Sequence, residues 1–128
     1  MKGVYCLLIS CRKPQSIRIG KLGVINFRKG FYLYVGSALN GIEGRVSRHL
    51  RSKKRKFWHI DYFLSNKYVN VDYVYCIETE KKIECDIAKK VRTTAKPVMR
   101  FGSSDCRCGS HLFFVYNREQ KRNNFVFV

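Results

Sequence analysis

The segment 31-FYLYVGSALNGIEGRVSRHL-50 contains a strand pattern followed directly by a helix pattern. Side chains of a strand alternate between its two faces, so Tyr32, Tyr34 and Gly36 share one face while the opposite face is wholly apolar. Glycine has no side chain, and we therefore expect an open space beside the two hydroxyl groups. This face of the strand is a candidate for a functional site.

The second part of the segment, from Ile42 to Leu50, has the spacing of an amphipathic helix. At about 100° per residue, every fourth residue from Ile42 to Leu50 should lie on the buried side. Arg48 should point away from that side, whereas Arg45 and His49 should flank it. Residues four apart on a helix contact the same surface, so a cation and an imidazole are directed at the rim of the tyrosine-bearing strand.

The remaining patterns predict a single α/β (α+β) domain over residues 1–128, with a small mixed or antiparallel sheet flanked by three helices. Two short runs on either side of 20-GKLG-23 predict an extra hairpin near residues 16–27. We expect strands at residues 3–9, 16–20, 24–27, 31–35, 70–77, 112–116 and 125–128, and helices at residues 42–50, 57–64 and 83–93.

The charge of the chain indicates an anionic partner. Lys and Arg number 26 and Asp and Glu 9, which gives a formal net charge of +17 over 128 residues. Such a balance favours a nucleic acid over a membrane surface, and because attraction to phosphate is blind to the sugar, DNA is expected and RNA stays open. No apolar run approaches the ~20 residues of a membrane span, and no leader with a cleavage site is visible, so we expect a cytoplasmic protein.

Six cysteines would allow three disulfides in a secreted chain, but without a secretion signal reduced thiols are expected. Cys6 and Cys76 lie in apolar strand patterns and are expected to be small core residues. Cys106, Cys108 and His111 lie within six residues of one another and are candidate zinc ligands, with Cys85 or His59 as a fourth. A structural or substrate-contacting loop is the alternative interpretation.

Two acidic residues at the start of the helix at 83–93 differ in their expected environment. Relative to Ile83, the apolar side of the helix is centred near about 65°, Glu84 lies near about 100° and Asp86 near about 300°. Glu84 therefore falls on the buried arc, where a carboxylate needs a partner, and Asp86 faces water. The simpler explanation for Glu84 is that acids are favoured in the first turn of any helix.

A dense run of cations, residues 51–56, follows the first helix. It is either a solvated loop or a contact for phosphates, and the net charge favours the second. The residues expected to bind nucleic acid are Gly36, Ser37, Arg48, His49, Arg51, Lys53, Lys54, Arg55 and Lys56.

Three motifs resemble the GIY-YIG nuclease superfamily: 3-GVY-5 on the first strand, 34-YVG-36 on a later strand, and Arg45 on the helix that follows. The 28 residues between the two tyrosines exceed the usual separation in that group, and the predicted hairpin would absorb them. The segments 58-WHIDY-62 and 102-GSSDCRCGSHLF-113 are similar to an uncharacterised, mainly archaeal branch, in which the domain sometimes follows an endonuclease III type DNA glycosylase.

The resemblance implies a metal-dependent DNA endonuclease, with a role in DNA repair and a repair protein as partner. It implies catalytic roles for five residues: Tyr5, Tyr34, Arg45, His59 and Glu84. Glu84 would hold Mg²⁺ or Mn²⁺, and Arg45 would clamp the scissile phosphate. A phenol at position 5 or 34 would relay a proton from the attacking water; His59 or His49 is the alternative relay.

Other functions fit the same residues. The late asparagine of some homing enzymes has no clear counterpart here, and Ser103 and Ser104 are the nearest candidates. The chain is therefore also compatible with a nucleic-acid-binding module that keeps the fold without cleavage, or with a zinc-stabilised adaptor of a repair enzyme.

Overall fold

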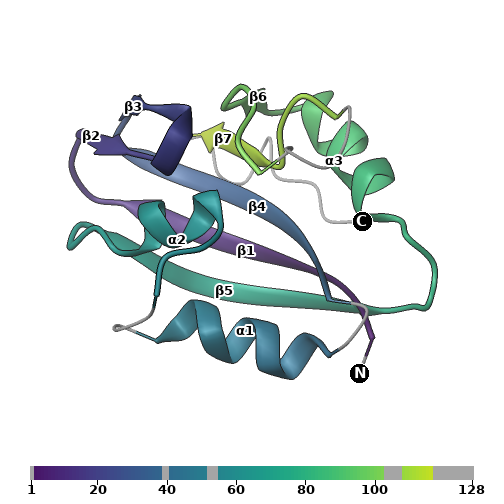
Figure 1. Ribbon diagram of the computed structural model, residues 1–128. Coiled ribbons are helices and arrows are strands. Elements are labelled where there is room, and N and C mark those ends of the chain that lie inside the picture. Colours follow the sequence, from purple (N-terminus) through teal and green to yellow (C-terminus); the bar gives the residue numbers. More distant parts are fainter. Residues whose placement is uncertain (1, 39–40, 52–54, 103–107, 117–128) are drawn as a thin grey trace.

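A computed structural model describes residues 2–38, 41–51, 55–102 and 108–116 of the chain (Figure 1). The described residues form a mixed α+β fold, as the sequence predicts. The strands are β1 (Gly3–Cys11), β2 (Gln15–Arg18), β3 (Val24–Phe27), β4 (Gly30–Ala38), β5 (Val69–Glu78), β6 (Lys96–Pro97) and β7 (Leu112–Tyr116); the helices are η1 (Gly20–Leu22, a 3₁₀ turn), α1 (Ile42–Leu50), α2 (His59–Leu64) and α3 (Glu84–Arg92).

Five strands form one antiparallel sheet in the order β5-β1-β4-β7-β6. Strands β2 and β3 form a separate hairpin, which confirms the expected insertion at residues 16–27. The insertion leaves β1 and β4 paired along their whole length, from Gly3 opposite Ala38 to Cys11 opposite Gly30. The expected strand at 125–128 lies outside the described residues.

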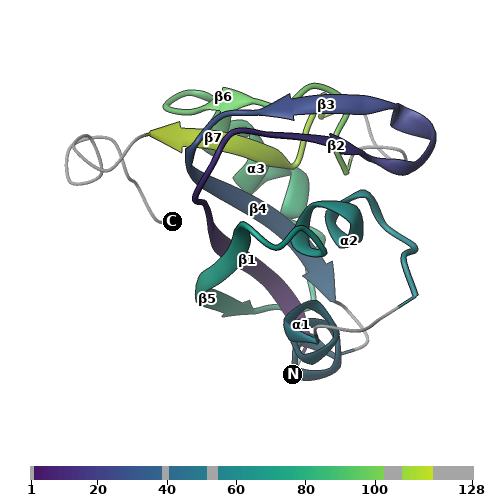
Figure 2. The ribbon, with the colours of Figure 1, turned by 90° about the vertical axis from the view of Figure 1, so that its left-hand side faces the viewer.

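The sheet is covered on both faces. Helices α1 and α2 lie against one face and α3 against the other (Figures 1 and 2). Alternation along β4 divides its residues as predicted: Tyr32 and Tyr34 belong to the core beneath α1 and α2, and Leu33 and Val35 to the core beneath α3. Both cores are apolar, so the tyrosine face is a buried interior rather than an exposed polar surface.

The expected phase of α1 is wrong at its carboxyl end. Leu50 is 57% exposed, whereas His49 is only 3% exposed and takes the inward position. His49 bonds the hydroxyl of Tyr5 on β1, and this bond lets a polar ring occupy the interior in place of a leucine. Arg48 does not point away either, because it is anchored to Asp61 at the start of α2.

The cysteines have different environments. Cys6 is buried as expected, but Cys76 is exposed, because β5 is an edge strand of the sheet and has only β1 as a neighbour. Cys6, Cys11 and Cys76 are free thiols. Across the described ranges, none of the helices has the length and apolar character that crossing a membrane requires.

Candidate functional site

The first feature of the site is the contact between Tyr5 and Gly36, which face each other across β1 and β4. A Cβ atom built on Gly36 would lie 2.2 Å from Cζ and 2.4 Å from the hydroxyl oxygen of Tyr5. The sequence predicts an open space above Gly36, and this prediction is wrong. The Tyr5 ring fills that space. Any larger residue at position 36 would displace this phenol.

Tyr5 is the centre of a buried polar group. Its hydroxyl lies 2.6 Å from Nε2 of His49, and its ring centre lies 6.4 Å from that of Tyr34. The His49 and Tyr34 ring centres are 6.1 Å apart, so three rings from β1, β4 and α1 meet at one point. Two phenols and an imidazole thus share one site in the interior between the sheet and α1.

Both phenols are protonated at neutral pH. Burial raises the pKa of Tyr5 and that of Tyr34 well above the ordinary value of a phenol. The nearby Arg45 guanidinium partly opposes this effect on the pKa of both, while the Glu84 carboxylate adds to it. The site therefore brings Arg45 and Glu84, from two different helices, close enough to the phenols to act on them electrostatically.

A tryptophan fixes the position of the Arg45 guanidinium. Two arginines of α1 lie over the Trp58 ring, with Cζ of Arg45 4.3 Å and Cζ of Arg48 4.2 Å from the ring centre. Such cation–π stacking restrains a flexible side chain without neutralising its charge. Arg45 can therefore present donors to an anion at the rim of the phenol site.

Arg48 has a structural partner. Its guanidinium donates to both carboxylate oxygens of Asp61, at 2.7 and 2.9 Å, and Asp61 is fully buried. Asp61 also accepts the backbone N–H groups of Phe57 and Trp58. Burial alone would raise the pKa of Asp61, but these hydrogen bonds outweigh it and lower the pKa. Arg48 thus holds the start of α2 in place, whatever role it has toward nucleic acid.

The two acids of α3 lie as their helical phases predict. Asp86 is exposed, whereas the Glu84 side chain is only 30% exposed. One Glu84 oxygen lies 3.5 Å from Nδ1 of His111, which also lies 3.2 Å from the carbonyl oxygen of Val35 on β4. Glu84 therefore has a defined partner and remains open to solvent on one side.

The loop at Gly102 connects His59 to the phenol site by a hydrogen bond. His59 accepts the backbone N–H of Gly102 at Nδ1, over 2.9 Å. A Cβ on Gly102 would lie 3.3 Å from both Cβ of His111 and Cε1 of Tyr34, so the loop packs against both side chains. Burial lowers the pKa of His59. With Nδ1 engaged, the neutral His59 carries its proton on Nε2, where it can donate but not accept.

A second cluster of ligand atoms lies beside Glu84. The thiols of Cys85 and Cys108 and a ring nitrogen of His111 lie within 4.8 Å of one another, and this cluster could hold a metal ion. Cys85 Sγ is 3.9 Å from His111 Nε2. Of the expected set, Cys106 lies outside the described residues, and His59 is bonded to Gly102 instead. Cys85, from the first turn of α3, takes the place of the additional ligand.

The model of one protein family, a domain of unknown function designated DUF123, matches residues 4–127. The chain belongs to the DUF123 family. A search of the curated proteins found no match, and a search of the solved structures found none either. The matched range includes both strands, all three helices and the loop that build the site, so the phenol site and the thiol cluster are parts of the DUF123 domain itself.

The residues expected to bind nucleic acid differ in their exposure within this DUF123 domain. Arg51, Arg55 and Lys56 are exposed, Ser37 is partly buried, and Gly36 and His49 are buried. Lys53 and Lys54 lie outside the described residues, as do Ser103 and Ser104.

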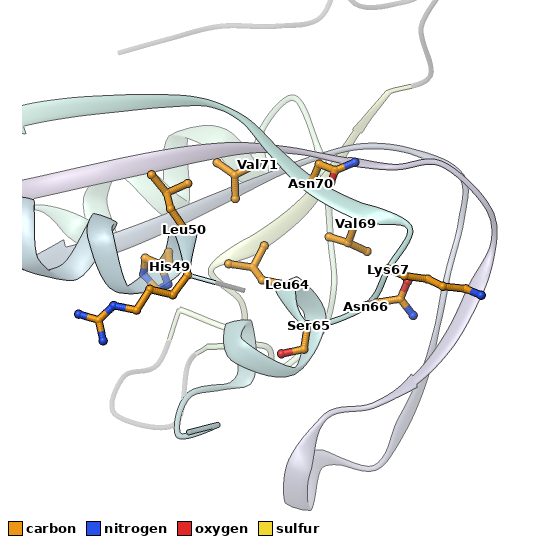
Figure 3. A pocket seen from close by; sticks show the side chains of 10 residues that line it. His49, Leu50, Leu64, Ser65, Asn66, Lys67, Val69, Asn70 and Val71 are labelled. Carbon is orange, nitrogen blue, oxygen red and sulfur yellow. The ribbon is translucent and has the colours of Figure 1, made fainter. Parts of the chain in front are cut away.

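A pocket of about 400 Å³ opens beside His49 (Figure 3). It lies between the carboxyl ends of α1 and α2 and the beginning of β5, and His49 belongs both to its wall and to the phenol site. Its lining includes Arg51, Lys67 and two asparagines but no acid. An anionic ligand is thus better suited to this surface than a cationic one.

Sequence reasoning missed two members of the site. The sequence pattern indicates His111 only as a zinc ligand, although its Cβ lies next to Gly102 and its Nδ1 lies beside Glu84. The pattern at residues 57–64 predicts a helix that includes Trp58 and does not indicate that its ring positions Arg45. An aromatic residue just before a helix, preceded by a run of cations, is the signal that could have pointed to Trp58.

Proposed function

We propose that this domain is a metal-dependent endonuclease that hydrolyses phosphodiester bonds of DNA. The observation that carries the proposal is the convergence around Tyr5, where an imidazole and a guanidinium from α1, a second phenol from β4 and a carboxylate from α3 come together. Phosphodiester hydrolysis needs this combination: a route for protons, a cation for the developing negative charge, and a carboxylate for a divalent ion. A role in DNA repair rests on the resemblance to the GIY-YIG nucleases.

Arg45 binds the scissile phosphate in this proposal. Its planar, permanently charged side chain can offer two donors to two phosphate oxygens, and the Trp58 ring holds it in place beforehand. Less conformational freedom is then lost when the phosphate arrives. Arg45 also lies next to Tyr5, so the phosphate is bound beside the hydroxyl that handles the proton.

The position of Glu84 fits Mg²⁺ or Mn²⁺. Such ions are bound by one or two carboxylates and complete their shell with water and phosphate oxygens. The Glu84 carboxylate is partly exposed and lies at the edge of the phenol site, so it offers one ligand on the side that faces solvent. When bound, the ion would supply a more acidic water and neutralise charge on the phosphate.

The Tyr5–His49 pair provides the proton route. Tyr5 does not act as a free phenolate, because burial raises its pKa. A phenol that receives a proton from water while it passes its own to Nε2 of His49 stays neutral throughout. This arrangement makes His49 the final acceptor and Tyr5 the relay. Tyr34, buried beside them, completes the wall of the site.

Cleavage of plasmid DNA in Mg²⁺ tests the proposal. Glu84→Gln should lower the cleavage rate by about a hundredfold or more, since the metal ligand is weakened without a change of size. Asp86→Asn is the matched control, because Asp86 lies on the same helix but is exposed and faces away. Arg45→Ala should lower the rate similarly and also weaken DNA binding.

The alternative function is a nucleic-acid-binding module without cleavage. In that case the wild-type chain binds DNA with strong salt dependence but leaves plasmid, flapped and branched DNA intact in Mg²⁺ or Mn²⁺. Equal cutting by wild type and Glu84→Gln would argue against the proposed site, since the activity would then come from elsewhere.

For the second cluster, we infer that the metal is zinc. Two thiolates and an imidazole are soft to borderline ligands that zinc prefers, and Mg²⁺ avoids. Around tetrahedral zinc, with bonds of about 2.0–2.3 Å, ligand atoms lie about 3.5–3.8 Å apart. The observed separations, up to 4.8 Å, need only a small contraction. Nδ1 of His111, close to the Val35 carbonyl and Glu84, can donate its proton there and leave Nε2 for zinc.

Metal analysis of the purified protein tests the identity of this ion. We expect one zinc per chain in the wild type and a marked loss in Cys85→Ser. Cys76→Ser is the matched control, because Cys76 is an exposed free thiol on the edge strand β5. Equal zinc content in all three proteins would place the ion elsewhere, and no zinc in any of them would leave the cluster as reduced thiols.

A further inference from the structure

Phe57 is the most exposed large apolar side chain among the described residues, at 77%. It immediately precedes Trp58, the ring that positions Arg45. The Phe57 and Trp58 ring centres are 5.7 Å apart, with the rings almost perpendicular at 89°. Phe57 is therefore an aromatic ring held at the rim of the proposed phosphate site and open to solvent.

The folding of α2 does not explain this residue. Trp58 caps the helix, so Phe57 occupies the position from which an apolar residue usually packs against the fourth helical residue, here Tyr62. Instead, the ammonium group of Lys56 lies over the Tyr62 ring, 5.8 Å from its centre. Phe57 is left outside, where an exposed phenylalanine contributes little to stability.

The backbone beneath Phe57 is nevertheless firmly held. Its N–H donates to Asp61 over 2.7 Å, and Asp61 is fully buried and clamped by Arg48. The ring is thus presented from a fixed base, which lowers the entropy lost when a flat ligand stacks on it.

The surroundings indicate what the ligand is. Arg55 and Lys56 precede Phe57 and are exposed, and the Arg45 guanidinium lies against the Trp58 ring. An aromatic ring among cations suits single-stranded nucleic acid, in which bases stack on the ring and phosphates meet the charges. Inside a duplex the faces of the bases are already stacked on one another, so only an unpaired base can use this ring.

We propose that Phe57 stacks on an unpaired base of the DNA whose scissile phosphate Arg45 binds, so that the site selects DNA with a single-stranded segment next to the cut. This inference rests on the proposed nuclease function and adds its substrate class. Arg45 and Phe57 both lie against Trp58, at 4.3 Å and 5.7 Å from the centre of its ring, so one short stretch of nucleic acid can contact both.

Equilibrium binding in EDTA, measured by fluorescence anisotropy, tests the inference without any chemistry. The two probes are a blunt duplex and the same duplex with a short single-stranded flap. Phe57→Ala should weaken binding of the flapped DNA by about tenfold and that of the blunt duplex by less than about twofold. The salt dependence should be unchanged, because no phosphate contact is lost. Phe57→Trp should restore the affinity.

Tyr73→Ala is the matched control, because Tyr73 is another exposed aromatic residue, 55% exposed, on the edge strand β5. It should bind both DNAs as the wild type does. The inference is overturned if Phe57→Ala weakens both DNAs equally, or if it binds flapped DNA as well as the wild type. The second result would instead favour Phe57 as a contact for a protein partner.

The inference and the proposed function fail in different ways. Cleavage in Mg²⁺ that is equal for blunt and flapped DNA and insensitive to Phe57→Ala would overturn the inference and keep the nuclease. Binding of flapped DNA that depends on Phe57, without cleavage in Mg²⁺ or Mn²⁺, would keep the stacking surface and overturn the nuclease.

Discussion

Replacing Gly36 by alanine is the sharpest test of the site's geometry. Gly36 does not have a positive φ, so alanine can adopt the same backbone conformation without strain. Any loss of stability therefore comes from the added methyl group alone. That methyl would lie 2.2 Å from Cζ of Tyr5, against an ordinary carbon contact of about 3.5–4.0 Å. The Tyr5 ring is only 1% exposed and cannot move aside without leaving His49.

The expected loss of stability combines two effects. Overpacking of a core costs about 1–3 kcal/mol, and the loss of the Tyr5–His49 hydrogen bond about 1 kcal/mol more. We therefore expect Gly36→Ala to lower the free energy of unfolding by about 2–4 kcal/mol. Urea unfolding followed by the fluorescence of Trp58, the single tryptophan of the chain, should show a midpoint lower by about 1–2 M.

A double-mutant cycle separates the contact with Tyr5 from any other effect of the methyl group. In Tyr5→Leu the side chain ends before the position of Cζ, so the methyl at position 36 has room. We expect Gly36→Ala to cost less than about 1 kcal/mol in that background, which gives a coupling energy of about 2 kcal/mol. The same cost in both backgrounds, or a stable Gly36→Ala in the wild type, would refute the close approach of these two residues.

Three further outcomes are expected. Asp61→Asn should destabilise the fold by about 3 kcal/mol, since it leaves Arg48 without its carboxylate. The pKa of Asp61 is lowered by folding, so this stabilisation is present above the unfolded pKa of about 3.9 and is lost as the pH falls through the folded pKa. Urea unfolding should therefore show a large difference in stability between the wild type and Asp61→Asn at neutral pH and a smaller one at acid pH. Leu50→Ser should change the free energy of unfolding by less than about 0.5 kcal/mol, whereas Ile42→Ala, at a buried position of the same helix, should lower it by about 2–4 kcal/mol. An equal loss in the two variants would mean that Leu50 is buried, as the sequence pattern predicts. A zinc chelator should lower the melting temperature of the wild type and leave Cys85→Ser unaffected, and thermal melts with no shift in either protein would count against a structural zinc.

The sequence was sufficient for those parts of the fold that depend on local periodicity. The alternation from Tyr32 to Val35 fixes which residues face each helix layer, because a strand has a strict period of two. The helical phases of Glu84 and Asp86 were likewise predictable, because α3 is regular from its first turn.

The wrong predictions share one cause: a local sequence pattern does not show which distant residue a side chain will contact. Leu50 is more apolar than His49, so the pattern predicts that Leu50 is the buried residue. His49 is buried instead because its ring makes a hydrogen bond with Tyr5, 44 residues away. Cys76 follows the same alternation as a central strand, and nothing local reveals that β5 lies at the edge. The ring above Gly36 depends on the register between β1 and β4, which a single strand does not show.

The site itself exists because the sheet stops pairing at a particular residue. Strand β7 pairs with β4 from Phe31 to Tyr34, and at Val35 a single bond from its N–H to the His111 carbonyl closes the ladder. Among the described residues, the pairing of β7 with β4 ends there. Glu84, although it belongs to the helix on the opposite face, can therefore act on phenols that belong to the other core. A site that uses both faces of a sheet requires such an interrupted edge.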